Sequence, residues 1–207
     1  MDKVERLLIP DSGELRIGVI ADTHVPDRTA NLHPGVIPTF MQYKVDIIFH
    51  AGDICDARVE EELGKVAPVR AVLGNRDWLF GRKLPQLYRF EVDGLQGALM
   101  HGQGSFMDYW SDKVLYTLTG YQFDRYRDVM HRIVPEADLI IFGHTHRAVN
   151  KKYGERWYFN PGCASSPKFQ HGPSIGIITI GKEQQIQGEI ITLQGAVLEK
   201  RIWKTQK

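Results

Sequence analysis

Three short apolar runs in the first half of the chain each end at a polar side chain. Their length and their β-branched residues predict buried strands. The runs are ELRIGVIAD (14–22), VDIIFHAGD (45–53) and VRAVLGNRD (69–77). Asp22, Asp53 and Asn75 stand where these runs end, so the predicted strands deliver carboxylates and an amide at their carboxyl ends.

Helical patterns lie between these runs. In ARVEEELGKV, Val59 and Leu63 are four residues apart and share one face of a predicted helix. The stretch PGVIPTFMQY predicts a shorter helix, which Pro34 can start and Pro38 limits. Because strand, helix and strand alternate here, we expect a parallel sheet.

The second half of the chain is mostly strand. LYRFEVDGLQGALMHG predicts a hairpin with its turn at Asp93-Gly94. Further strands are expected in a second hairpin turning at Tyr153-Gly154 and around 175–180 and 185–193. The predicted fold class is therefore α/β, with two sheets packed face to face and helices outside them.

Length and composition indicate one ordinary globular domain. The 207 residues are 43% hydrophobic and 25% charged, which is enough to bury a core without disulfides or a structural metal. We expect a single domain over 1–207, with 103–134 as an insertion or lid-like excursion that is helical towards its end. The net charge of +1 gives no reason to expect a nucleic-acid partner.

The sequence predicts neither a membrane protein nor a secreted one. No apolar run approaches the ~20 residues that a membrane span needs, and the charged first residues do not resemble a signal peptide. Cys55 and Cys163 form no CxxC motif and suit a reducing compartment. We therefore expect a cytoplasmic protein without a membrane partner.

Seven potential metal ligands follow predicted strands in five segments of the chain. They are Asp22 and His24 in ADTH, Asp53 in AGD, Asn75 in GNRD, His101 in MHG, and His144 and His146 in GHTH. The carboxyl ends of parallel strands form the crevice where ligands bind, so we expect these side chains to meet at one edge. Seven donors are too many for one tetrahedral ion. They suit two ions ~3.5–4 Å apart that share a carboxylate, a centre used to displace a leaving group at phosphorus.

The same motifs, in this order, resemble those of the calcineurin-like metallophosphoesterase superfamily. The small size, the position of the first strand and the sequence NPG (160–162) are similar to its compact bacterial and archaeal phosphodiesterase branch. The resemblance implies a four-layer α/β/β/α sandwich with two packed mixed sheets. It also implies in-line attack on phosphorus by a hydroxide that bridges two metal ions.

The resemblance further implies a ligand set for each ion. The first ion would take Asp22, His24 and His146, the second would take Asn75, His101 and His144, and Asp53 would bridge them. Mn²⁺ is the first choice of cofactor. Fe, Ni and Zn are alternatives, because mixed oxygen and nitrogen ligands do not decide among these metals.

The third motif departs from the family pattern at Arg76. Many members carry a histidine there that is thought to protonate the leaving group, whereas arginine keeps its proton at ordinary pH. Arg76 is therefore predicted to stabilise phosphoryl charge, with a solvated loop side chain as the alternative. Asp77, His171 and a metal-bound water are the remaining candidates for a catalytic acid.

Three further histidines and Cys163 are not predicted to take part in the reaction. His50 is predicted to be a buried donor behind the ligands, with metal ligation as the alternative. His33 is expected in a loop and His131 on the surface of a helix. Cys163 has no assigned base, so we do not predict a nucleophile there.

Aromatic residues concentrate in the predicted excursion. They are Phe106, Tyr109, Trp110, Tyr116, Tyr121, Phe123 and Tyr126. Three roles are open for them: packing the excursion onto the body of the protein, forming a wall of the substrate pocket, or forming the interface of a homo-oligomer, where aromatic residues concentrate.

Three functions compete on this sequence. The first is a dinuclear phosphoesterase acting on a small phosphate ester, with a diester favoured over a monoester. The second is a non-catalytic scaffold, as in the retromer subunit of similar fold, which has lost part of the ligand pattern. All seven ligands are present here, which favours the enzyme. The third, a protein serine/threonine phosphatase, would be a longer chain with additional arginine-bearing motifs.

Overall fold

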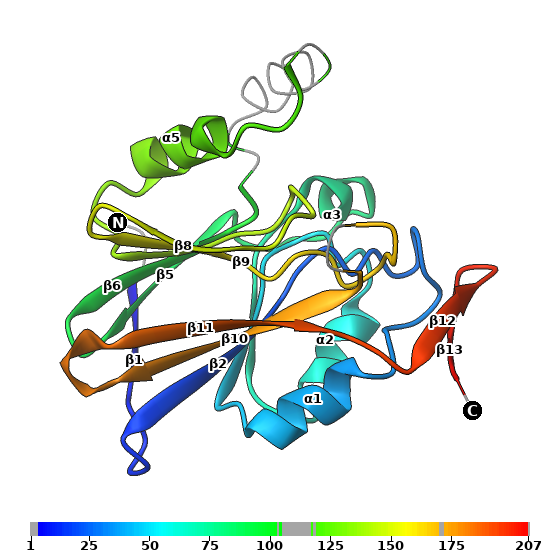
Figure 1. The fold of residues 1–207 in the computed structure, drawn as a ribbon, viewed down its shortest axis with the longest axis horizontal. Coiled ribbons are helices and arrows are strands. Elements are labelled where there is room, and N and C mark those ends of the chain that lie inside the picture. The colour runs from blue at the N-terminus through cyan, green and yellow to red at the C-terminus, as the bar shows by residue number, and fades with distance from the viewer. Residues whose placement is uncertain (1–3, 103, 105–116, 118, 170–171, 207) are drawn as a thin grey trace.

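Two mixed β-sheets form the body of the computed structural model, which describes residues 4–102, 104, 117, 119–169 and 172–206 (Figure 1). The five-stranded sheet has the order β11-β10-β2-β3-β4. Its strands are β2 (Glu14–Ile20), β3 (Ile47–His50), β4 (Val69–Ala71), β10 (Ser174–Gly181) and β11 (Ile186–Thr192). Strands β2, β3 and β4 are parallel, as the alternation of strand and helix predicts.

The six-stranded sheet has the order β1-β5-β6-β7-β9-β8. Its strands are β1 (Val4–Leu7), β5 (Leu87–Val92), β6 (Leu95–Met100), β7 (Leu139–Ile141), β8 (Val149–Tyr153) and β9 (Arg156–Asn160). Both predicted hairpins are confirmed, since β5 pairs antiparallel with β6 and β8 with β9. At the first turn Asp93 and Gly94 both have positive φ, which an Asp-Gly hairpin turn requires.

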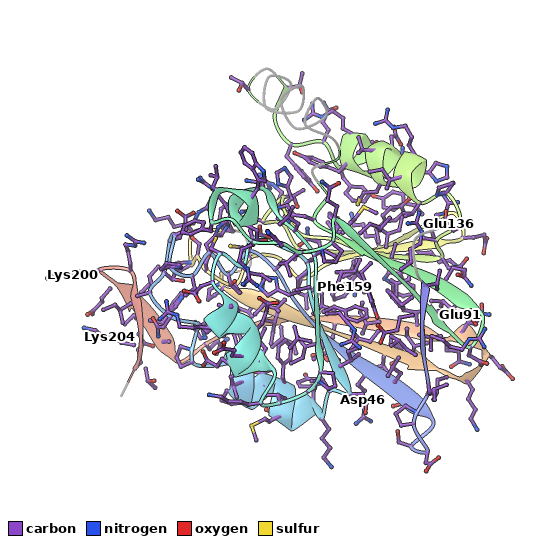
Figure 2. All side chains as sticks on the ribbon, turned by 180° about the vertical axis from the view of Figure 1, so that it is seen from behind. Asp46, Glu91, Glu136, Phe159, Lys200 and Lys204 are labelled. Carbon is purple, nitrogen blue, oxygen red and sulfur yellow. The ribbon has the colours of Figure 1, made fainter. Side chains whose placement is uncertain are left out.

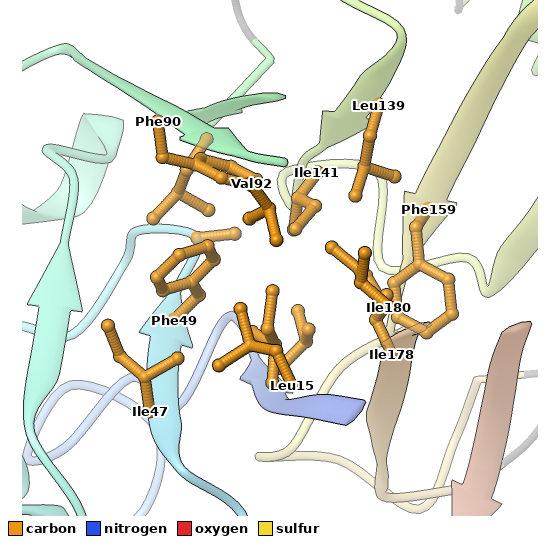
Figure 3. Close-up of a cluster of buried hydrophobic side chains, with 14 of the residues drawn as sticks. Leu15, Ile47, Phe49, Phe90, Val92, Leu139, Ile141, Phe159, Ile178 and Ile180 are labelled. Carbon is orange, nitrogen blue, oxygen red and sulfur yellow. The ribbon is translucent and has the colours of Figure 1, made fainter. Parts of the chain in front are cut away.

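The space between the two sheets is filled by apolar side chains, as Figures 2 and 3 show. Alternate residues of β2 and β3 face this core, among them Ile17 and Ile47, while Ile20 and Ile48 face the opposite side. Phe49 meets Phe90 of the other sheet edge-to-face, with 5.0 Å between the ring centroids. Strands buried on both faces explain why these segments read as continuous apolar runs rather than alternating ones.

Helices cover both outer faces. Helices α1 (Val36–Tyr43) and α2 (Ala57–Leu63) lie on the five-stranded sheet, where Phe40 and Leu63 pack with Ile48. Helix α5 (Phe123–Ile133) lies on the six-stranded sheet, where Met130 packs with Ile140. The order of layers is therefore helix, sheet, sheet, helix, which confirms the predicted α/β/β/α sandwich.

The aromatic excursion is described only in part. Its last segment is α5, which forms the outer layer, and Tyr126 is buried there. Phe106, Tyr109, Trp110 and Tyr116 lie outside the described residues, so the predicted lid-like excursion over 103–134 stays a prediction.

Five elements of the described chain were not predicted. Three are β1 at the edge of the six-stranded sheet, the short helix α3 (Asn75–Leu79) and the 3-10 helix η1 (Lys182–Gln184). The other two are β12 (Ala196–Glu199) and β13 (Ile202–Thr205), which form the C-terminal hairpin at the red end of the chain in Figure 1. The described part of the chain holds no helix with both the length and the apolar character that crossing a bilayer demands.

Candidate metal centre

All seven predicted ligands gather where the ends of the two sheets meet. The five-stranded sheet supplies Asp22 and His24 after β2, Asp53 after β3 and Asn75 after β4; the six-stranded sheet supplies His101 after β6, and His144 and His146 after β7. Neither sheet alone carries the set, so the site depends on the packing of one sheet against the other.

One group of donors converges on Asp22. Its Oδ1 atom lies 3.4 Å from His146 Nε2 and 3.8 Å from His24 Nε2, and these two imidazole nitrogens are 3.5 Å apart. The other carboxylate oxygen, Oδ2, accepts a hydrogen bond from the backbone N–H of His144. Among the described residues, Asp22 Oδ1 has no hydrogen-bond partner, although it is fully buried.

A second group of donors converges on Asn75. Its Oδ1 atom lies 3.2 Å from both His101 Nε2 and His144 Nδ1. The other nitrogen of His101, Nδ1, is 2.7 Å from the backbone oxygen of Ala51. Donation to that carbonyl places the proton on Nδ1 and leaves the lone pair of Nε2 directed at Asn75.

Asp53 lies between the two groups. Its Oδ2 atom is 3.6 Å from His24 Nε2, and its Oδ1 atom is 3.5 Å from His101 Nε2. The two oxygens of one carboxylate thus face different clusters. Asp53 Oδ1 also accepts the backbone N–H of Arg76 at 2.7 Å, which fixes the orientation of the carboxylate.

The loops that carry these ligands are tightly wound. Five of the seven candidate ligands have positive φ: Asp22, His24, Asp53, His144 and His146. Side chains other than glycine rarely adopt this region, and such strain clusters at functional sites. Gly74 shows how close the loops approach, because a Cβ there would lie 2.2 Å from Asp53 Oδ1.

Asp77 holds the loop of Asp53 from beneath. Its carboxylate accepts four backbone N–H groups, from Asp53 (2.9 Å), Ile54 (2.9 Å), Cys55 (2.6 Å) and Gly74 (2.8 Å). The side chain is fully buried. The predicted role of Asp77 as a catalytic acid does not fit this geometry, because both oxygens are engaged by the backbone and neither is available to a substrate.

The electrostatics of the site favour cations. Burial, together with the charge of Asp53, raises the pKa of Asp22 well above its ordinary value. Burial lowers the pKa of His24, and it lowers the pKa of His146 to about 3, so both imidazoles are neutral with lone pairs available. Two buried carboxylates beside neutral imidazoles, with Asp22 Oδ1 unpaired, fit divalent ions, which reverse the cost of burying negative charge.

The remaining candidates lie outside the two donor groups. His50 is fully buried, as predicted, and its Nε2 atom is 3.1 Å from the hydroxyl of Thr23, which lies between two candidate ligands. His33 is in a loop but is buried, and His131 is exposed on α5. Burial raises the pKa of the Cys163 thiol to about 12, which suits an inert side chain. His171 lies outside the described residues.

Two charged residues beside the site, Asp27 and Arg28, were not predicted from the sequence. The Oδ2 atom of Asp27 lies 3.7 Å from both His24 Nδ1 and Arg76 Nε. The backbone N–H of Arg28 donates to the backbone oxygen of His24 at 2.7 Å, and burial and then the charge of Arg28 lower the pKa of His24 and of His146. Both residues follow His24 in the stretch HVPDR, and nothing in that stretch repeats the pattern of a strand ending in a ligand.

Comparison with known proteins identifies the family of this chain. The family model for the calcineurin-like phosphoesterase superfamily domain matches residues 15–183. The chain belongs to the calcineurin-like phosphoesterase superfamily. A probable metallophosphoesterase of Methanothermobacter thermautotrophicus is 32% identical over 175 residues, which are 84% of this chain and 91% of the relative. One from Methanocaldococcus jannaschii is 29% identical over 182 residues, which are 88% of this chain and 83% of the relative.

Solved structures of other proteins share the fold of this chain. Vacuolar Protein Sorting 29 from Cryptosporidium parvum has a TM-score of 0.62 at 15% identity, covering 87% of this chain and 98% of that one. An archaeal phosphodiesterase has a TM-score of 0.56 at 22% identity, and the match covers 86% of this chain and 100% of that one. Membership of this superfamily supports hydrolysis of phosphate esters, and the site described above supplies candidate metal ligands.

We predict that Asp77→Asn destabilises the metal-free protein by about 2–4 kcal/mol, because the amide of asparagine confronts two buried backbone N–H donors that have lost their acceptor. Asp56→Asn is the matched control. Asp56 caps α2 at the surface and accepts one backbone N–H, from Arg58, so its replacement should cost less than about 1 kcal/mol. Urea denaturation measures both values, and an Asp77→Asn protein as stable as wild type would refute the assignment.

We also predict a pH dependence of stability from His50. Burial lowers the pKa of His50 to about 3 in the folded protein, whereas in the unfolded chain it is about 6.5. Between about pH 3 and about pH 6.5, therefore, the unfolded chain binds a proton at His50 and the folded protein does not. Stability should therefore fall as the pH is lowered through this window. In His50→Gln, which keeps a polar group near Thr23, unfolding of metal-free protein should take up about one proton fewer at pH 5. An unchanged slope of unfolding free energy against pH would contradict the buried neutral state.

Proposed function

We propose that this protein is a dinuclear metal-dependent phosphodiesterase. The observation that supports two ions rather than one is the position of Asp53, whose two oxygens face separate donor groups 3.6 Å and 3.5 Å away. Asp22, His24 and His146 would hold the first ion, and Asn75, His101 and His144 would hold the second. Mn²⁺ is the preferred metal, with Fe, Ni and Zn as alternatives.

The ions and the protein contribute different parts of the chemistry. When bound, two divalent ions activate water as a nucleophile and neutralise charge on the phosphoryl oxygens. The protein orients these ligands by hydrogen bonds to its backbone. Nδ1 of His101 donates to the backbone oxygen of Ala51, and Oδ1 of Asp53 accepts the backbone N–H of Arg76. Arg76 follows ligand Asn75 and is partly exposed, so its guanidinium can hydrogen-bond phosphoryl oxygens of a substrate.

A diester is the favoured substrate. The fold is shared with an archaeal phosphodiesterase, and the small size of the chain and the sequence NPG (160–162) are similar to the compact phosphodiesterase branch of the superfamily. The test is hydrolysis of an aryl phosphodiester and the corresponding aryl phosphomonoester in the presence of Mn²⁺, Fe, Ni or Zn, each supplied in turn. Faster cleavage of the diester supports the proposal. Faster cleavage of the monoester supports a phosphomonoesterase instead. The absence of both activities with all four metals favours a scaffold of the same fold.

We predict that Asp53→Asn lowers kcat more than His24→Ala, because the first change weakens both ions and the second weakens one. Both variants are compared at metal concentrations that saturate each protein, with occupancy verified by elemental analysis. Equal losses at matched occupancy would count against a carboxylate shared between two ions.

We predict a steep dependence of rate on the pKa of the leaving group, because the guanidinium of Arg76 has no proton to give. General-acid assistance is typically worth ~10²–10⁴-fold, and aryl esters need it least. Arg76→His should flatten the dependence and raise the relative rate of alkyl esters, whereas Arg76→Ala should weaken binding or rate for all esters. Similar wild-type rates for alkyl and aryl diesters, with chemistry rate-limiting, would refute this role.

A further inference from the structure

The C-terminal hairpin lies at the edge of the molecule in Figure 1 and contacts the segment that follows His24. Strands β12 and β13 follow the region 15–183 that the family model matches. They pair only with each other among the described strands. The turn between them is Lys200-Arg201, and both residues have positive φ, 47° and 70°. Glycine and asparagine are preferred in such turns. A lysine and an arginine in this conformation indicate that contacts with another part of the chain hold the turn.

Arg201 at this turn binds the loop that follows His24. Its guanidinium donates to the backbone oxygens of Pro26 and Asp27, the latter at 2.7 Å. Its backbone oxygen accepts the N–H of Ala30 at 2.6 Å. One residue thus satisfies backbone groups at both ends of the segment 26–30.

A second anchor lies at the other end of the loop. The side-chain amide of Asn31 donates to the backbone oxygen of Trp203 and accepts its N–H, at 3.2 and 3.0 Å. Trp203 is only 4% exposed and meets His33 edge-to-face, with 4.6 Å between ring centroids. The hairpin is therefore packed firmly against 26–33 rather than projecting freely into solvent.

The segment 26–33, which the hairpin contacts, follows the candidate ligand His24 closely in the chain. The backbone oxygen of His24 accepts the N–H groups of Arg28 and Thr29, at 2.7 and 3.3 Å. The hydroxyl of Thr29 donates to the backbone oxygen of Thr23. The loop thus forms one compact turn directly after His24.

Asp27 connects this loop to Arg76. Its backbone oxygen is held by Arg201, and its carboxylate lies 3.7 Å from both Arg76 Nε and His24 Nδ1. A movement of the loop would therefore move the counter-ion of the arginine that is placed to meet the substrate.

We propose that the hairpin β12–β13 is a positioning element of the site: through Arg201 it fixes Asp27, and Asp27 orients the guanidinium of Arg76 towards the phosphoryl group. This inference rests on the proposed function only in assigning the phosphoryl group as the partner of Arg76. Asp27 and Arg201 are positioning residues, because they act through Arg76.

The experiment compares Arg201→Ala, Asp27→Asn and Arg76→Ala, together with the double variants that combine Arg76→Ala with each of the other two. Lys204→Ala is the control, because Lys204 forms an ion pair with Glu199 inside the hairpin. Two readouts are used. One is hydrogen exchange of amides 28–30 in metal-free protein. The other is the affinity for inorganic phosphate with Mn²⁺ at saturation.

Arg201→Ala should speed exchange of amides 28–30 and weaken phosphate binding by about 3-fold, and Asp27→Asn should weaken it by about 5-fold, as for a partly exposed charge pair. Neither change should weaken binding further once Arg76 is alanine, because coupled residues are not additive. Lys204→Ala should resemble wild type. If Arg201→Ala does not fold, Asp27→Asn still tests the connection, since it leaves the contacts of the hairpin in place.

Three results would overturn the proposal: unchanged exchange in Arg201→Ala, full additivity with Arg76→Ala, or equal phosphate affinity in wild type and Arg76→Ala. Failure of the proposed function is a separate outcome. It would be seen as absence of ester hydrolysis, while phosphate binding still reports the coupling among Arg201, Asp27 and Arg76.

Discussion

Two buried carboxylates, Asp22 and Asp53, set the constraint on which the rest of the site depends. Each is almost completely excluded from solvent, and the burial of Asp22 beside the charge of Asp53 raises its pKa. Unpaired buried charge is costly, so a cation beside Asp22 would stabilise its carboxylate form. The neutral imidazoles of His24 and His146 supply donors rather than compensating charge. The chemistry of the site therefore calls for metal ions.

Holding those carboxylates together requires support from several directions. The two sheets bring together strand ends that are distant in sequence. The core around Phe49 and Phe90 packs one sheet against the other. The four backbone bonds to Asp77 fix the loop that carries Asp53. The C-terminal hairpin forms hydrogen bonds with the loop that follows His24. The positive φ values of the ligand residues show why the loops need such support.

The parts of this account that are local in sequence could be predicted from it. Runs such as ELRIGVIAD signal a buried strand through their own composition, and Asp93-Gly94 specifies its own turn. The seven candidate ligands could be predicted because each lies at the end of an apolar run or within a few residues of it. Their convergence was expected from the general rule that ligands bind at the carboxyl ends of parallel strands.

The parts that depend on distant contacts could not be predicted. Arg201 and Pro26 are 175 residues apart, and neither lies in a pattern that predicts their hydrogen bond. The role of Asp77 is decided by backbone N–H groups at 53–55, which leave no trace in residue type. Helix α3 was missed because it is only one short turn beside a ligand loop, and β1 because its residues VERL are half charged and lie at a sheet edge.

The central claim is that one carboxylate, Asp53, joins two metal ions. The most direct test is a crystal structure of the Mn²⁺-loaded protein with anomalous scattering data collected at the manganese absorption edge. The account predicts two anomalous peaks about 3.5–4 Å apart, with Asp53 contacting both, Asp22 and His146 at one, and Asn75 and His101 at the other. A single peak at full loading, or two peaks that do not share Asp53, would contradict it.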